Sequence, residues 1–192
     1  GSALFSQFAG SFSPLGDLLL KAFARRSGDI WRRLPMVKPI LEGESLGSLI
    51  DPLPSGLLST EAIYADAIKT LEQSSTGRLM VVDEKQRLWG TLDRDDINQI
   101  LARIAVIPLE TRGDVTHRKV TDFLVANPVY VTLEDSALVA FATMLDHGIG
   151  WLPVVKSNDD LQPVGSLRSE KIVNRLIEKI AQMQPGHAAV AS

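Results

Sequence analysis

The sequence contains one pattern twice, 73 residues apart, and this duplication limits the folds that the chain can adopt. Aligning residues 58–83 with residues 131–156 needs no gap and gives seven identical pairs among 26 positions. Chance would give roughly one or two, so the repeat is genuine. The identical pairs are Glu61/Glu134, Ala67/Ala140, Thr70/Thr143, Gly77/Gly150, Leu79/Leu152, Val81/Val154 and Val82/Val155.

Each copy shows the same order of local structural signals. In the second copy, residues 128–132 are rich in β-branched and aromatic side chains, which predicts a strand. Thr132 and Asp135 have the spacing of a capping box, and Gly148 is placed to end the helix that follows. The remaining elements expected there are a strand at 151–156, a strand ending near Leu167, and a helix from Ser169 to about Ala181.

The first copy repeats this order, with strands expected at 57–59, 78–83 and 88–92 and helices at 61–73 and 95–104. The unit is therefore β-α-β-β-α, twice, and the fold class is α+β. A sheet with helices on one face cannot close its core alone, so we expect the two copies to pack sheet to sheet. The shared phrases GRLMVV and GWLPVV would then be the central strands, apolar because both faces are covered.

Composition excludes several classes of function. With 45% hydrophobic and 22% charged residues the chain has the make-up of a soluble globular protein. The net charge of −3 gives no reason to expect nucleic-acid binding, and the lack of cysteine excludes disulfides and thiolate chemistry. His117, His147 and His187 lack metal-ligand spacing, so we expect no metal site. Hydrolase, phosphate-loop and zinc-protease motifs are absent, so we expect no enzyme activity.

Both copies resemble the sequence pattern of cystathionine-beta-synthase (CBS) domains, an apolar strand, a polar turn, and then Gly-x-apolar-Thr-x-x-Asp at a helix start. The first copy reads LMVVDEKQRLWG followed by Gly90 to Asp96, and the second reads LPVV followed, after its turn, by Gly165 to Lys171. The resemblance covers about residues 46–180. It implies a tandem CBS pair, or Bateman module, which regulates other proteins and often binds an adenine nucleotide in clefts between its repeats.

The resemblance also implies which positions contact such a ligand. In the family pattern the threonine binds phosphate, the aspartate accepts from the ribose hydroxyls, and strand residues hold the base. Backbone amides at the helix start also favour phosphate. The matching candidates for binding AMP, ADP or ATP in this chain are Ser59, Thr60, Met80, Val81, Asp93, Asp96, Thr132, Pro153, Val154, Arg168 and Lys171.

The chain departs from this pattern at both helix starts. Asp93 stands at the threonine position of the first copy, where a second carboxylate would repel phosphate, whereas Asp96 keeps the ribose-binding position. Arg168 and Lys171 replace the threonine and the aspartate of the second copy. The second cleft is therefore either vestigial or a site whose two cations hold a more anionic group. The first cleft, lined by Ser59, Thr60, Met80, Val81 and Asp96, is the better candidate for a nucleoside.

The residues outside the repeats have a character of their own. Residues 21–38 hold six basic residues and a single acid, Asp29, beside apolar and aromatic residues, which is typical of a stretch facing anionic lipid headgroups. The alternative is a solvated linker helix whose leucines pack on the repeats. Residues 35–44 contain two prolines and a glycine and are expected to form the hinge into the first repeat. The start Gly1-Ser2, without methionine, is typical of a fragment excised from a larger protein.

We therefore expect a helical, basic linker at 1–45, CBS repeats at 46–106 and 119–182, an inter-repeat linker at 107–118 and a flexible tail at 183–192. The leading hypothesis is a regulatory module on the cytoplasmic face of a CLC-type chloride channel or transporter. It would sense an adenine nucleotide or relay a conformational signal as a homodimer, because the helix face carrying Leu176 and Ile180 lacks a partner in the chain. The alternatives are a purely structural dimerisation module with vestigial clefts, and an accessory domain of a membrane-embedded zinc protease.

Overall fold

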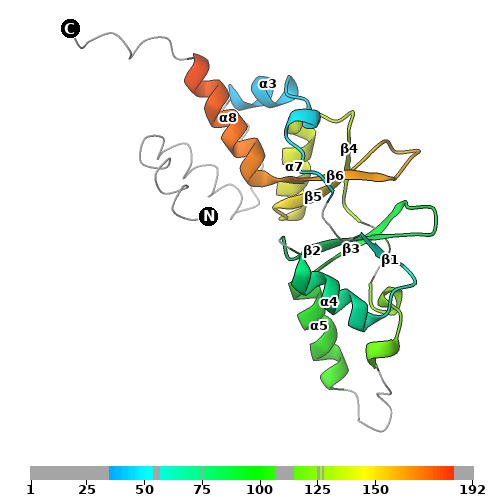
Figure 1. The fold of residues 1–192 in the computed structure, drawn as a ribbon. Helices are drawn as coiled ribbons and strands as arrows, with labels where there is room; N and C mark the ends of the chain where they lie inside the picture. Colours follow the sequence, from blue (N-terminus) through cyan, green and yellow to red (C-terminus); the bar gives the residue numbers. More distant parts are fainter. Residues whose placement is uncertain are drawn as a thin grey trace. The chain divides into compact units, whose positions relative to one another are not determined.

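The computed structural model describes residues 35–53, 57–74, 76–106, 115–124, 126 and 128–183 (Figure 1). Short helices α3 (Val37–Glu42) and η1 (Leu46–Ser48) precede the first repeat. The first repeat comprises β1 (Leu57–Ser59), α4 (Tyr64–Gln73), β2 (Arg78–Val82), β3 (Leu88–Asp93) and α5 (Arg94–Ala105). The 3-10 turns η2 (Val115–His117) and η3 (Val120–Asp122) lead to the second repeat, which comprises β4 (Val131–Thr132), α7 (Ala137–His147), β5 (Trp151–Val155), β6 (Pro163–Arg168) and α8 (Ser169–Met183).

Both repeats build the predicted β-α-β-β-α unit around a three-stranded sheet. The strand orders are β1-β2-β3 and β4-β5-β6, so the duplicated phrases lie in the central strands β2 and β5, as predicted. In the first sheet β1 runs parallel to β2, and β3 runs antiparallel to it. In the second sheet β4 is parallel to β5, with Val131 opposite Val154. The duplicated sequence therefore forms two sheets with the same strand order, and the α+β fold class is as predicted.

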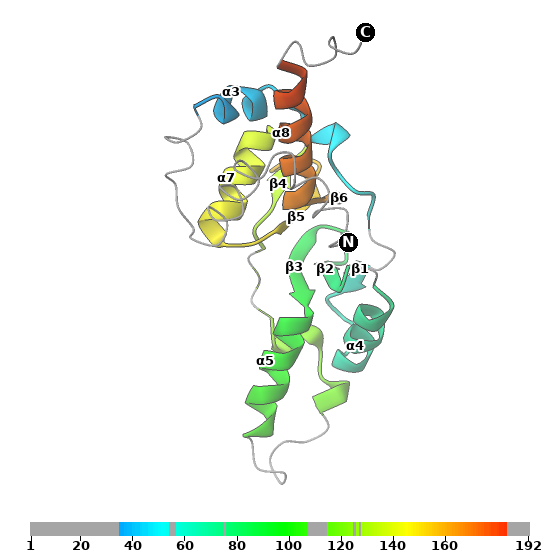
Figure 2. The same ribbon diagram turned by 90° about the vertical axis from the view of Figure 1, so that its left-hand side faces the viewer.

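Contacts divide the chain into two units, which we describe separately. Unit 1 contains the residues up to Ile50, Glu134–Leu152 and the chain from Leu167 onward, and unit 2 contains Asp51–Leu133 and Pro153–Ser166. Unit 2 therefore takes segments from both repeats, whereas unit 1 combines parts of the second repeat with the residues that precede the first. In the turned view of Figure 2, α4 and α5 lie together on one side of the first sheet in unit 2, and α3, α7 and α8 group together in unit 1.

The hydrophobic core of unit 2 lies between the first sheet and its helices. Tyr64 at the start of α4 is almost fully buried, and its hydroxyl donates to the carbonyl oxygen of Ile97 over 3.3 Å. The ring of Tyr64 also packs against Phe123, with centroids 5.5 Å apart. The buried members of the cluster are Leu58, Tyr64, Ala67, Leu71, Leu79, Val81, Leu92, Ile97, Ile100, Ile104 and Val120.

The helices α4 and α7 begin later than the sequence predicts. The amide of Thr60 donates to Val82 O over 2.9 Å, and the amide of Leu133 donates to Val155 O over 3.0 Å, so both segments continue the strand pairing. Helix α4 consequently begins at Tyr64 instead of Glu61. Helix α7 begins at Ala137, with Ser136 as its N-cap, so the capping box predicted for Thr132 and Asp135 is wrong.

The predicted end of α7 at Gly148 is confirmed. Gly148 has φ of 65°, a left-handed conformation that costs glycine nothing. Its amide donates to Leu145 O over 3.2 Å, and the next amide, of Ile149, donates to Met144 O over 3.0 Å. These two bonds satisfy carbonyl groups at the helix end and turn the chain toward β5.

Residues 35–44 do not form the expected hinge but largely the helix α3. The residue Pro39 is tolerated because it stands in the first helical turn, where its missing amide would have no partner in the helix. Helix α3 contacts α7 and α8, and both Val37 and Leu41 are fully buried. The expectation that Leu176 and Ile180 lack a partner is also wrong, because their exposed fractions are 0% and 8% within the chain.

The residues before each repeat pair with the helix start of the other repeat. In unit 1, Ala137 N donates to Glu44 O over 2.9 Å, and Ser45 forms a bridge with Ser136. In unit 2, Tyr64 N donates to Arg118 O over 2.9 Å, and Lys119 forms the equivalent bridge with Ile63. The two flanks thus dock in the same way, each on the partner repeat.

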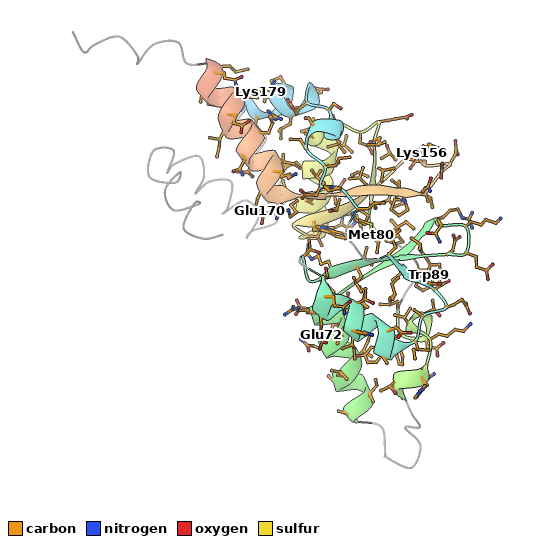
Figure 3. All side chains as sticks on the ribbon, in the orientation of Figure 1. Glu72, Met80, Trp89, Lys156, Glu170 and Lys179 are labelled. Atoms are coloured by element: carbon orange, nitrogen blue, oxygen red, sulfur yellow. The ribbon has the colours of Figure 1, made fainter. Side chains whose placement is uncertain are left out.

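The carboxylate of Glu44 strengthens the first of these contacts. It lies 3.2 Å from Arg175 Nε and 3.3 Å from Lys179 Nζ on α8, where Lys179 is labelled in Figure 3. Its side chain is only 12% exposed, so these attractions are poorly screened by water. Over the described ranges, no helix has the length and apolar character needed to cross a membrane.

Candidate ligand site of the first repeat

The first turn of α5 is closed by the side chains of two aspartates. Asp93 is the N-cap residue, and its Oδ1 accepts from Asp95 N over 2.9 Å and from Asp96 N over 3.0 Å. Asp96 in turn accepts from Asp93 N at Oδ2 over 2.9 Å, which completes a reciprocal capping box. Two amide groups that a free helix end would offer to an anion therefore already bind a carboxylate.

Asp96 is held in this box while partly buried. Burial raises the pKa of its carboxyl group, the nearby Asp93 carboxylate raises it further, and the hydrogen bond from Asp93 N opposes both effects. One oxygen of Asp96, Oδ2, is committed to the cap. A carboxylate has about four lone-pair sites, so Asp96 retains acceptor capacity for a ligand hydroxyl group.

A cavity of about 370 Å³ that is largely open to solvent lies beside this capped helix start, entirely within unit 2. It forms where α4 ends, β2 begins, β3 ends and α5 begins. Its lining combines two cations, two carboxylates and two hydroxyl groups. The lining residues are Ser74, Thr76, Gly77, Arg78, Asp93, Arg94 and Asp95.

Gly77 shapes one wall of the cavity. Its φ of 65° is left-handed, and a Cβ atom at this position would lie 3.4 Å from Nε of Arg94. The hydroxyl group of Ser74 forms a 3.0 Å hydrogen bond with that of Thr76 and donates to Arg78 O over 3.1 Å. The Arg94 side chain can therefore lie close over Gly77, beside a turn fixed by hydroxyl hydrogen bonds.

Of the predicted ligand contacts, only Asp93 lines this cavity. Met80 (labelled in Figure 3) and Val81 lie on β2 and are fully buried, and Val81 belongs to the core cluster beneath the helices. Ser59 Oγ accepts from Glu61 N over 3.1 Å, and Thr60 pairs with β2. Thr132, Pro153 and Val154 are buried on β4 and β5. Their roles as ligand contacts stay predictions.

The second repeat has a different helix start. Arg168 is the exposed last residue of β6, and Lys171 lies in the first turn of α8. Ser169 N donates to Gly150 O over 3.0 Å, and its Oγ would lie 3.3 Å from a Cβ atom at Gly150. These residues belong to unit 1, whereas the cavity belongs to unit 2.

Sequence reasoning missed six of the seven lining residues, namely Ser74, Thr76, Gly77, Arg78, Arg94 and Asp95. The signal was nevertheless present, because Arg78 follows the duplicated Gly77 and Arg94 follows Asp93. An arginine beside each of two motif positions could have been recognised as a possible anion or hydroxyl contact. Among the described residues, no group of three or more histidine, aspartate or glutamate side chains could hold a metal ion.

Comparison with protein-family models identifies the class of protein. The model described as "CBS domain" matches residues 58–103 and 120–178, which together exceed half of the chain. The chain therefore belongs to the CBS-domain family and carries a tandem pair of these domains. Such pairs are regulatory modules. No curated protein sequence gave a significant match.

Solved structures show the same fold at low sequence identity. An uncharacterised conserved protein from Pyrococcus horikoshii is 22% identical, with a TM-score of 0.57 over 78% of this chain. MJ1225 from Methanocaldococcus jannaschii is 19% identical, with a TM-score of 0.58 over 76% of this chain. CBSX2, solved in complex with AMP, is 21% identical, with a TM-score of 0.55 over 72% of this chain and 99% of its own. The chain spans only 61% and 51% of the first two.

Proposed function

We propose that this CBS pair senses an adenosine-containing ligand at the cavity of its first repeat and transmits the binding to a larger protein. The observation that carries this proposal is the cavity of about 370 Å³ beside the capped start of α5. Its volume falls within the usual range for small-molecule sites, roughly 300–1,000 Å³. The relative CBSX2 was solved with AMP, which supports the ligand class.

The side chains around the cavity suit a nucleoside. Asp96 does not line the cavity itself, but it follows the lining residue Asp95 in the first turn of α5. It can accept from a ribose hydroxyl group while it still caps the helix. Arg78 and Arg94 present planar guanidinium groups, which stack on aromatic rings and donate to ring nitrogens or oxygens. We assign no catalytic role to these residues, since a sensor needs only differential affinity between two conformations.

Thermal unfolding tests this proposal directly. The melting temperature is measured with and without adenosine, AMP, ADP, ATP and S-adenosylmethionine. A ligand present at a hundred times its Kd adds about 2.7 kcal/mol of stability, which is readily detected as a higher Tm. A ligand that shifts wild-type Tm is then tested on Asp96→Asn, which keeps an acceptor for Asp93 N but loses the charge.

Asp66→Asn is the matched control, since Asp66 is an exposed first-turn acid of α4 in the same repeat. We expect the shift to shrink strongly in Asp96→Asn and to persist in Asp66→Asn. A shift that is equal in all three proteins would place the ligand elsewhere. No shift with any of the five compounds would reject ligand sensing by this module.

The second candidate function is dimerisation without a ligand, and the internal cap of α5 favours it. A helix start that satisfies its own amides needs no ligand to be stable. The large apolar side chains left exposed include Leu101 on α5 (47%) and Val139 on α7 (44%). Sedimentation of the wild-type protein and of Leu101→Glu and Val139→Glu measures this. A wild-type dimer that either variant dissociates would support the candidate, and a wild-type monomer at high concentration would refute it.

We also propose that the module belongs to a membrane channel or transporter of the CLC type and works at its cytoplasmic face. The basic composition of residues 21–38 supports this setting, although residues 21–34 lie outside the described residues. Flotation with vesicles tests it. We expect the wild-type protein to bind phosphatidylserine vesicles but not neutral vesicles. The double variant Arg32→Gln/Arg33→Gln should not bind phosphatidylserine vesicles. Equal recovery with both vesicle types would contradict it, and an accessory role in a membrane zinc protease is the alternative.

A further inference from the structure

We infer that Asp93 acts as a built-in anion at the start of α5, so that the cavity selects adenosyl ligands without a 5′-phosphate over nucleotides. This inference rests on the proposed function, because it names the class of ligand that the same cavity accepts. It would make Asp93 the residue that determines specificity.

The backbone amides at the start of α5 already bind carboxylates. A phosphate group bound at a helix start is held by free amide groups and by the positive end of the helix dipole. Here the amides of Asp95 and Asp96 donate to Asp93 Oδ1 over 2.9 and 3.0 Å. The amide of Asp93 itself donates to Asp96 Oδ2 over 2.9 Å. A phosphate would have to displace carboxylates that are covalently tethered beside these donors.

The carboxylates that line the cavity oppose the entry of a phosphate group. Asp93 and Asp95 both line the cavity, so an incoming phosphate would approach two carboxylates as well as occupied amides. Asp93 is partly buried and Asp95 is exposed, so the repulsion from Asp93 is the less screened of the two. An uncharged hydroxymethyl group, as in adenosine, or a cationic sulfonium, as in S-adenosylmethionine, meets no such repulsion.

The two arginines of the cavity would by themselves form a phosphate clamp, but each stands among carboxylates. Arg94 starts α5 directly beside Asp93 and approaches the Gly77 wall, and Arg78 lies in the same cavity. Arg78, Arg94, Asp93 and Asp95 together place two positive and two negative charges around the cavity. A cavity with balanced charge favours a neutral or zwitterionic ligand over one with a net charge of −2, because the excess charge finds no matching partner.

The decisive variant is Asp93→Ser. Serine is as good an N-cap as aspartate, so the variant keeps the helix start while it removes the carboxylate. Titration calorimetry with adenosine and with AMP measures the ratio of the two affinities in wild type, in Asp93→Ser and in the charge-matched control Asp66→Asn. We expect wild type to prefer adenosine at least about tenfold, and we expect the ratio to fall at least about tenfold in Asp93→Ser only.

A second measurement does not depend on any nucleoside. Titrating inorganic phosphate while recording amide NMR shifts should leave Asp95 and Asp96 unchanged in wild type and should move both amides in Asp93→Ser. Wild type that binds AMP as tightly as adenosine, or an unchanged ratio in Asp93→Ser, would overturn the inference and leave ligand sensing intact. Absence of adenosine and AMP binding in both proteins would reject ligand sensing, and with it the selection among ligands.

Discussion

The starts of α5 and α8 occupy equivalent places in the two repeats but carry opposite charges. Residues 93–96 at the start of α5 hold three aspartates and Arg94, a net charge of −2. Residues 168–171 at the start of α8 hold Arg168, Lys171 and Glu170, a net charge of +1. Both repeats nevertheless keep the same strand order and the same buried central strand. The difference teaches that the duplicated scaffold depends on buried apolar residues, while the residues at its helix starts can change sign without changing the fold.

The largest effect should come from the leucine that both central strands share. Leu79 and Leu152 are fully buried equivalents, and truncating a buried leucine to alanine typically costs 2–5 kcal/mol. We expect Leu79→Ala and Leu152→Ala each to lower the free energy of unfolding by about 3 kcal/mol in urea titrations. If one variant lost less than about 1 kcal/mol, the two repeats would not share an equivalent core.

A smaller effect should separate the two docked flanks. Glu44 is nearly buried between Arg175 and Lys179, whereas Glu61 and Lys119 are 59% and 52% exposed although their pair is only 2.6 Å apart. We expect Glu44→Gln to cost about 1.5 kcal/mol, because Lys179 loses its carboxylate partner and Arg175 keeps only the more exposed Glu178. Glu61→Gln should cost less than about 0.5 kcal/mol. Equal losses in chemical denaturation would show that burial does not distinguish the flanks.

Removing the N-cap side chains of α5 and α7 should have smaller effects on stability. Asp93 accepts two backbone hydrogen bonds of 2.9 and 3.0 Å at the start of α5, but Ser136 accepts one of 3.4 Å at the start of α7. We expect Asp93→Ala to cost about 1.5 kcal/mol at most, and Ser136→Ala about 0.5 kcal/mol. Thermal unfolding of both variants measures this. A larger loss for Ser136→Ala would contradict the geometry of the two caps.

The smallest effect concerns pH. Because burial and Asp93 raise the pKa of Asp96 in the folded state, the folded protein binds this proton more tightly than the unfolded chain does. The stability that this provides is present below the ordinary carboxyl pKa and is lost as pH rises through the raised value. The Asp96→Asn variant should therefore have the same free energy of unfolding as wild type at acidic pH and a higher one than wild type near neutral pH. Urea unfolding across this range measures the difference, and a gain confined to acid would contradict it.

Local patterns were sufficient to predict the elements of both repeats, because strand and helix periodicity are encoded over a few residues. The starts of α4 and α7 were predicted too early, since the amides of Thr60 and Leu133 pair with strands more than 20 residues away in sequence. The hinge expected at residues 35–44 is largely a helix for the same reason, because its burial depends on α7 and α8.

The candidate site was predicted only in part. Asp93 and Asp96 were recognised by their place in the family pattern, but that their carboxylates bind the neighbouring amides depends on side-chain conformation. Arg78 and Arg94 were missed because they stand next to the motif positions Gly77 and Asp93 and are not themselves part of the family pattern. Their shared cavity exists only once β2 and α5 are brought together in three dimensions.

The crossed docking of the flanks has a consequence for chain connectivity. Glu44 and Ser45 pair with residues after position 130, and Arg118 and Lys119 pair with residues before position 70. Cutting the backbone between the repeats would therefore not release two independent domains, since each unit draws strands or helices from both sides of the cut. The halves would have to reassemble as complementary fragments, and neither half-gene would encode a complete folding unit.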